Sequence, residues 1–487
     1  MNRVRPRGKD YLLLAGLAVA AIIVHGYHPA IEDAEIYTPG ILKVLYPSLF
    51  PYNVEFFESH ARMTFFPQLI AGSIRVTHLP LGAALLAWHV FSIFLLLLGC
   101  WRIASLCFEE KHAAWCGIAL VGSLLSIPVA GTRLFLMDPY FTTRSLSAPG
   151  ALLGVAGVLK EKYLASAMWI FFTAVIHPLM AVFAAVYVGI ILLLKFRTKS
   201  VGAAASVAVL PEQLFPPVTS EYREILQTRP YFFLTNWAWY EWLGLLAPFA
   251  IFAWFASVAK RYALGPMNLA CRALVIYGAM FFSVALIISR PGRFENFSEI
   301  QPLRYLHLLY ILMFLFIGGL LGKCVLQRKA WRWAVLFVPL CAGMAYAQQE
   351  TSPATAHLEL PGRASGNPWV QAFEWIRVNT PEDAYFALNP KHMALPGEDQ
   401  HGFRAIAQRS MLADAVKDSG AASMFPALAG KWKEQARAQE GWEKFRYEDF
   451  LRLKQRYGVN WVAVERPGAA GLVCPYANEL LLVCQIK

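Results

Sequence analysis

The chain has 487 residues, of which 57% are hydrophobic and only 16% are charged. This composition excludes an ordinary soluble globule and predicts a polytopic membrane protein with enough length for a soluble domain. The formal net charge is +12, but the basic residues are spread between apolar runs instead of gathering on one face, so we expect no nucleic-acid partner.

The apolar runs predict the number of membrane crossings. A helix needs about 20 apolar residues to cross the hydrocarbon core, and about eleven runs approach that length. The first run has no small-residue cleavage site after it, so we interpret it as a retained anchor and not as a signal peptide. The expected spans are 11–27, 80–101, 112–130, 145–160, 163–179, 180–195, 200–212, 238–259, 267–289, 303–322 and 332–349.

The basic residues between these runs predict the orientation. With a cytoplasmic N-terminus, every cytoplasmic connection carries Lys or Arg, as the positive-inside rule requires. The apolar stretch 63–78 then lies on the outer surface without crossing, because counting it as a span would place the basic clusters outside. The expected outer connections are 28–79, with amphipathic surface helices, and 131–144, 213–237 and 290–302.

A polar linker with Pro and Gly, residues 350–366, separates a membrane part, 1–349, from a soluble part, 367–487. In the soluble part, Asn367 followed by proline predicts a helix N-terminus, and Gly458 closes an amphipathic helix before two apolar strands. We therefore expect a small extracytoplasmic α/β domain at the C-terminus.

Two cysteines of this domain, Cys474 and Cys484, fall on two apparent strands, where a disulfide could form if the register allows it. The other six cysteines lie in or beside apolar runs, and there a small buried side chain is the usual role. We interpret Arg404, Arg409 and Lys417 as a basic patch on a solvated face.

The densest acidic cluster, Glu32, Asp33 and Glu35, directly follows the first apolar run. Repulsion between close carboxylates and a nearby low dielectric predict that at least one of them has a raised pKa and acts as a base. The alternative is an ordinary solvated loop. A second outer loop brings Asp138, flanked by Arg144, to the same membrane face, and this favours a shared site.

Basic residues are unexpected on the outer face, yet one short connection carries Arg290, Arg293, Arg304 and His307. Arginine near hydrocarbon is costly unless it meets an anion, and the phosphate of a lipid is the anion available there. Snorkelling to headgroups is the simpler alternative. His177, which precedes a proline at the outer end of a span, is a weaker candidate because it could simply cap a helix.

Several common chemistries have no signature in this sequence. It contains neither GxxxxGK[ST] nor GxGxxG, and neither HExxH nor GxSxG. We therefore expect a reaction that does not use cytosolic nucleotide, with a donor supplied through the membrane.

The pattern resembles the GT-C class of integral membrane glycosyltransferases, which includes oligosaccharyltransferase catalytic subunits, protein mannosyltransferases and the aminoarabinose transferase of lipid A. The features that carry the resemblance are the acidic "EDAE" motif right after the first span, the long first outer loop, the number of spans and the C-terminal α/β domain. No signature resembles the oligosaccharyltransferase WWD motif. The resemblance implies a bacterial member of the class in the cytoplasmic membrane.

The resemblance also implies roles for individual residues. A sugar would pass from a polyprenyl-phosphate donor to a lipid, glycan or protein acceptor at the outer face. Asp33 by best match, or its neighbour Glu32, would be the general base, and Asp138 would orient the acceptor or, with Asp33, hold a divalent metal. The donor phosphate would contact Arg144, Arg293, Arg304 and His307, and we add Glu35, His177 and Arg290 as candidate substrate contacts.

Two other classes of function compete with this prediction. A lipid or solute transporter, or flippase, would place ionisable residues near mid-bilayer, whereas the polar groups here gather at one face; a non-catalytic membrane scaffold is the other alternative. If Asp33 and Asp138 lie more than about 15 Å apart, a shared catalytic site is excluded.

Overall fold

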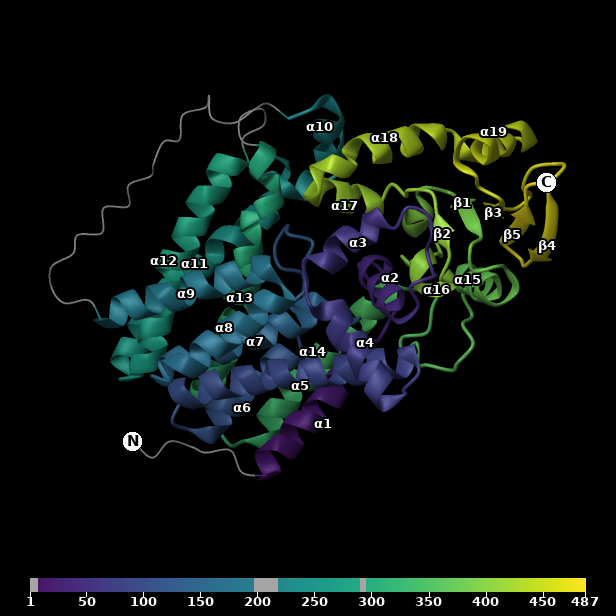
Figure 1. Ribbon diagram of the computed structural model, residues 1–487. Helices are drawn as coiled ribbons and strands as arrows, with labels where there is room; N and C mark the ends of the chain where they lie inside the picture. The colour runs from purple at the N-terminus through teal and green to yellow at the C-terminus, as the bar shows by residue number, and fades with distance from the viewer. Residues whose placement is uncertain (1–7, 197–217, 290–294) are drawn as a thin grey trace.

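The computed structural model describes residues 8–196, 218–289 and 295–487, and Figure 1 shows its arrangement. A bundle of helices forms the larger part, and a small domain that contains a β-sheet lies at one end of the bundle. The expected span 200–212 and the candidates Arg290 and Arg293 lie outside the described residues.

Seven helices of the described residues are long and apolar enough to cross a membrane. The chain is therefore a polytopic helical protein, as the sequence predicts. These helices are α1 Gly8–His25, α5 Leu81–Cys107, α9 Pro178–Phe196, α11 Trp239–Arg261, α12 Gly265–Ile288, the segment Phe297–Leu326 with α13 Tyr305–Leu321, and α14 Ala330–Thr351.

Three further expected spans form shorter helices, so the expected total of about eleven spans stays a prediction. They are α6 Lys111–Gly122, α7 Thr143–Leu159 and α8 Tyr163–Ile176. Almost every residue of α7 is buried, and it packs closely on α8 because glycine faces the contact. A Cβ on Gly154 would lie 2.8 Å from Ile170, and one on Gly157 would lie 2.9 Å from the backbone of Ser166.

The connections expected at the cytoplasmic face meet at one end of the bundle. Lys195, in the last turn of α9, pairs with Glu161 between α7 and α8 at 2.8 Å. Lys323 after α13 pairs with Glu110 before α6, and its ammonium lies 5.7 Å from the ring of Tyr262, after α11. These contacts agree with the alternation of connections that the sequence predicts.

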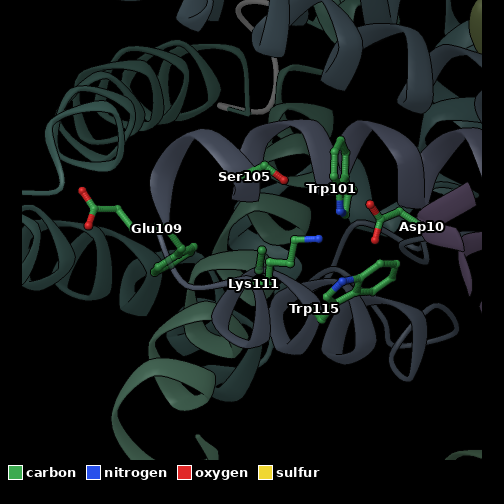
Figure 2. A pocket seen from close by; sticks show the side chains of 8 residues that line it. Asp10, Trp101, Ser105, Glu109, Lys111 and Trp115 are labelled. Atoms are coloured by element: carbon green, nitrogen blue, oxygen red, sulfur yellow. The ribbon is translucent and has the colours of Figure 1, made fainter. Parts of the chain in front are cut away.

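The same end contains a small pocket lined by Asp10 at the start of α1, Trp101 of α5, and Lys111 and Trp115 of α6 (Figure 2). Asp10 is the third residue of the 18-residue helix α1, so about 23 Å of helix separates it from the acidic cluster that follows. The pocket is therefore not part of the candidate site.

The first outer loop contains α2 Ala34–Leu45, α3 Glu55–Arg62 and α4 Phe66–Thr77. Helix α4 has 12 residues and is about 18 Å long, which is too short for a hydrocarbon core of about 30 Å. Phe65, Val76 and Leu79 expose apolar side chains at or beside its ends. Its length is consistent with the prediction that 63–78 lies on the membrane surface without crossing.

The C-terminal domain has a five-stranded sheet of order β2-β1-β3-β5-β4. Strand β1 pairs in parallel with β2 and β3, and β5 pairs antiparallel with both β3 and β4. Apolar side chains of α15 cover one face of the sheet and those of α19 cover the other. The elements are β1 Tyr385–Leu388, β2 Ser410–Met411, β3 Trp461–Glu465, β4 Val473–Ala477, β5 Leu481–Gln485, α15 Pro368–Asn379, α16 Phe403–Ala407, α17 Lys417–Met424, α18 Ala429–Ala438 and α19 Tyr447–Tyr457.

Local signals in the sequence explain the boundaries of this domain's helices. Asn367 caps α15, because its side chain accepts a hydrogen bond from the backbone N–H of Trp369 at 2.9 Å. Gly458 ends α19 with φ +80°, in the left-handed region. A disulfide joins Cys474 of β4 to Cys484 of β5, a pairing that the sequence left open. The α/β elements that the sequence predicts are present.

The domain packs onto the connections that we expect at the outer face. One apolar cluster contains Phe56 of α3, Tyr222 and Ile225 of α10 (Ser220–Gln227), and Trp432 of α18. Isolated β-bridges join Tyr27 to Leu358 and Ile31 to His401. Residues 28–62 and 218–237 therefore lie at the same end of the bundle as the C-terminal domain, as their expected outer location requires.

Candidate functional site

Two carboxylates from different connections, both expected at the outer face, meet at one arginine. Arg144, in the first turn of α7, donates from Nε and Nη2 to Oδ2 of Asp138 at 3.1 and 2.8 Å. Its Nη1 lies 2.9 Å from Oδ2 of Asp33, the residue before α2. The structure thus brings Asp33, Asp138 and Arg144 into one site.

Backbone contacts fix the loop that carries Asp138. The ring of His307, on α13, makes a 3.0 Å hydrogen bond through Nε2 with the carbonyl of Leu136, and the N–H of His28 donates to the carbonyl of Pro139 at 2.8 Å. His307 is buried. The ring of His307 therefore holds the loop in place through Nε2, and its role as a phosphate contact stays a prediction.

A cation that the sequence did not indicate completes the cluster. Nζ of Lys417, the first residue of α17, lies 3.0 Å from Oδ1 of Asp33 and also pairs with Glu32. Lys417, Arg404 and Arg409 are all buried. The interpretation of these three residues as a solvated basic patch is therefore wrong, because the sequence shows their charge but not the partners that the fold supplies.

Glu35 belongs to a different cluster. Its Oε1 accepts from the backbone N–H of Arg404 at 3.0 Å and from Nη1 of Arg404 at 3.2 Å, and its Oε2 accepts from the N–H of Ala405 at 3.0 Å. Arg404 also makes two hydrogen bonds with Asp418. Glu35 is fully buried, so it anchors α2 to the C-terminal domain and does not face a substrate, contrary to our expectation.

The electrostatics separate the acids. Burial favours a raised pKa for Asp33, but Lys417 and Arg144 outweigh it and hold the pKa well below its usual range. Burial raises the pKa of Asp138 against the opposing effect of Arg144. Burial also raises the pKa of Glu35 to about 8. A raised pKa is therefore present as predicted, but desolvation is its main cause, and it does not fall on Asp33.

Next to this cluster, Arg304 has a guanidinium without a carboxylate partner among the described residues. It is half-buried at the end of the 3₁₀ helix Pro302–Arg304. Its charge is repelled by that of Arg144 and attracted by that of Asp33, but neither Asp33 nor Asp138 forms an ion pair with it. An unpaired, half-buried arginine beside a second arginine favours an anionic ligand.

Polar side chains without partners lie around Arg304. Nε2 of His177, Nδ1 of His60 and Oγ1 of Thr64 are buried and make no hydrogen bond among the described residues. The charge of Arg304 acts on both histidines, and the N–H of Phe65 donates to the carbonyl of Val175 at 2.9 Å, which joins the two segments. The charge of Arg304 thus reaches His177, whose role as a substrate contact stays a prediction, while His60 and Thr64 lacked any distinguishing signal in the sequence.

The donor set does not fit a metal ion. Asp33 and Asp138 are two carboxylates whose facing oxygens already contact Arg144. Within the described ranges, no group of three or more His, Cys, Asp or Glu side chains is arranged to hold a metal. Arg144 lies where a bridging divalent ion would have to bind, so we derive no chemistry through a metal.

Comparison of the chain with models of known protein families gives no match, and comparison with curated proteins gives none either. The relation to GT-C glycosyltransferases thus stays a prediction from architecture and from the residues of this site.

Proposed function

We propose that this protein is a GT-C-type membrane glycosyltransferase that moves a sugar from a polyprenyl-phosphate donor to an acceptor at the outer face of a bacterial cytoplasmic membrane. The observation that carries the proposal is the cluster in which Asp33 and Asp138 share Arg144, next to Arg304, which has no carboxylate partner within the described residues. The cluster lies at the end of the bundle where the C-terminal domain docks.

Asp33 is the better placed of the two acids for contact with an acceptor. Its side chain is 27% exposed, whereas that of Asp138 is 6% exposed. Because its pKa is low, Asp33 is ionised throughout the physiological range. Each carboxylate oxygen has two lone pairs, so Asp33 accepts a hydroxyl hydrogen bond while its cations stay in place.

The proposed step is a displacement at the anomeric carbon of the donor sugar. The acceptor oxygen forms a bond to this carbon, its proton passes to Asp33, and the bond between the carbon and the phosphate oxygen breaks. The leaving polyprenyl phosphate takes the electron pair. Arg304 stabilises this negative charge, together with Nδ1 of His60 and Nε2 of His177, which make no hydrogen bond within the described residues. Asp138 orients Arg144.

The same proposal covers the placement of the chain in the membrane. With about eleven spans and a cytoplasmic N-terminus, the C-terminal domain lies outside the cytoplasm. The disulfide between Cys474 and Cys484 supports this placement, since disulfides persist in oxidising compartments such as the periplasm.

The test is turnover of labelled polyprenyl-phosphate sugars by purified full-length protein, with panels of sugar donors and of lipid, glycan and peptide acceptors. Wild type should consume one donor, and Asp33→Asn should bind that donor but turn it over about 100- to 1,000-fold more slowly. The matched control is Glu434→Gln. Glu434 is an exposed acid of α18 whose ion pair with Arg456 lies on the surface.

Two results would overturn the proposal. Wild-type protein that binds a donor and carries it across a bilayer without breaking the sugar–phosphate bond would be a flippase. Wild-type protein that binds no donor of the panel would be neither enzyme nor lipid carrier, which favours a scaffold.

A further inference from the structure

A lysine of the C-terminal domain reaches into the acidic site. The side chain of Lys417 is only 10% exposed, and its Nζ lies 3.0 Å from Oδ1 of Asp33. The other oxygen of Asp33, Oδ2, lies 2.9 Å from Nη1 of Arg144. Each oxygen of this carboxylate is therefore held by one cation, one from the membrane part and one from the C-terminal domain.

The backbone around Lys417 is fixed from two directions. Within the domain, Oδ1 of Asp414 accepts from the N–H groups of Val416 and Lys417 at 2.6 and 2.5 Å. From the outer connection before α11, Arg229 donates to Oγ of Ser419 at 2.7 Å and to the carbonyl of Val416. The ammonium group is thus held in place with less freedom than a surface lysine has.

The acidic turn is also held by the domain. Glu32 has φ +53°, a left-handed conformation that few residues other than glycine adopt. Its N–H donates to the carbonyl of Gln400 at 2.9 Å, and the N–H of Gly402 donates to the carbonyl of Ala30 at 2.8 Å. The conformation of this turn therefore depends on contact with the C-terminal domain.

The charges around Asp33 show what Lys417 contributes. Three carboxylates, of Glu32, Asp33 and Asp138, are compensated by two paired cations, Arg144 and Lys417. Without Lys417, the three carboxylates would share one cation, and a proton would bind Asp33 more readily. The other titratable groups whose charge acts at this position are Tyr37, His60, Tyr140 and Arg304.

We propose that Lys417 is a positioning residue for the glycosyl transfer, acting through Asp33, so that the site is complete only when the C-terminal domain is docked. This inference rests on the proposed function. Lys417 aims the Asp33 carboxylate at the acceptor and keeps it ionised, and it contacts neither the sugar nor the phosphate.

The test compares kcat/KM for the donor from about pH 2 to 8 in wild type, Lys417→Met and Lys417→Arg, all as full-length reconstituted protein, because the acid limb of wild type lies below the usual pKa of an aspartate. At pH 7 the Met variant should lose about 10- to 100-fold. Its activity should also begin to fall about 1 to 3 pH units higher than that of wild type as the solution is acidified. Lys417→Arg should restore the wild-type position of this acid limb, because the positive charge is kept.

Lys433→Met is the matched control. Lys433, on α18, is similarly buried and also joins the domain to an outer connection, since its Nζ lies 2.7 Å from Glu224 of α10. Within the described residues, Lys433 forms ion pairs with Glu221 and Glu224 and with no acid of the site. Its replacement should therefore leave the pH at which activity falls unchanged. If Lys417→Met is not recovered in folded form, Lys417→Gln replaces it.

The outcomes separate this inference from the proposed function. An active wild type whose acid limb is unchanged in the Lys417 variants overturns the positioning role alone. Loss of activity without a shift of the limb has the same meaning, because it indicates a merely structural contact. An inactive wild type overturns the proposed function and, with it, this inference.

Discussion

Asp33 and Glu35 lie two positions apart, yet the fold gives them opposite surroundings. Asp33 contacts two cations from two parts of the chain and remains 27% exposed. Glu35 is fully buried against Arg404 and the first backbone N–H groups of α16. The first cluster is open to a ligand and the second is closed.

The two clusters differ in whether polar groups without protein partners lie beside the ion pair, and such groups can bind a ligand. Near Asp33, some polar groups have no protein partner within the described ranges. Arg304 has no carboxylate partner, and one nitrogen each of His60 and His177 makes no hydrogen bond. Around Glu35, both oxygens are fully used inside the protein. We therefore expect variants at the closed cluster to change stability, and variants at the open cluster to change turnover.

The largest expected effect comes from Arg404→Met. It would leave the buried carboxylates of Glu35, Asp414 and Asp418 without a cation, and breaking a buried ion pair in this way lowers the free energy of unfolding by about 3–5 kcal/mol. Thermal unfolding of purified protein in detergent measures the change. The control is Arg452→Met, which removes an exposed ion pair with Asp449. If Arg404→Met lowers the unfolding temperature no more than this control does, the cluster around Glu35 does not stabilise the fold as we infer.

The second variant, Asp33→Asn, should change turnover far more than stability. Arg144 keeps Asp138 and Lys417 keeps Glu32, so the free energy of unfolding should fall by less than about 2 kcal/mol. Turnover should fall about 100-fold or more. If Asp33→Asn unfolds as easily as Arg404→Met, the two clusters do not differ as we infer.

The pH dependence of stability is the third comparison. Burial raises the pKa of Glu35 to about 8 and that of Asp418 to about 6, so the folded state keeps protons that the unfolded state has lost above about pH 4.5. Stability from this cluster should therefore decrease as the pH rises from about 5 to 8. The low pKa of Asp33 has the opposite sign, with stability lost only as the pH falls below about 4.

Glu35→Gln tests this assignment. The variant should flatten the decrease in unfolding temperature between about pH 5 and 8, by an amount equivalent to about 1–2 kcal/mol. His401, whose pKa is raised by Glu359 despite burial, contributes a decrease of the same sign in both proteins, so the difference between wild type and variant is the relevant quantity. Equal slopes in the two proteins would show that Glu35 does not hold the proton.

The smallest effect is expected at the other end of the bundle. Lys195→Ala removes the pair with Glu161, whose side chain is 63% exposed. Exposed pairs contribute less than about 1 kcal/mol, so thermal unfolding and turnover should stay close to wild type. A large loss of thermal stability or of turnover would contradict this expectation, because it would give the pair between Lys195 and Glu161 a role beyond that of an exposed contact.

Much of the fold was predictable because it depends on local patterns. Apolar runs of helical length gave α1, α5, α9, α11 and α12, and Asn367 and Gly458 marked helix ends through capping. The run 112–130 was too long a prediction, since α6 ends at Gly122 and an irregular segment follows. No periodicity distinguishes such a segment from the end of a span.

The candidate site was only partly predictable. The sequence placed Asp33, Asp138 and Arg144 at one membrane face, because orientation follows from the basic connections. It gave no sign that Glu35 would be buried, since adjacent acids look alike until their neighbours are known. It also missed Lys417, whose contact with Asp33 spans 384 residues and exists only after the C-terminal domain has docked.

That separation of 384 residues along the chain also has a meaning in time. At synthesis rates of about 5–20 residues per second, the acidic turn leaves the ribosome roughly 20 to 80 s before Lys417 does. Throughout that interval Glu32 and Asp33 lack their partner Lys417. The nascent protein thus passes through membrane insertion with this cluster unassembled, and Glu32 and Asp33 acquire their final contacts only after most of the chain has been made.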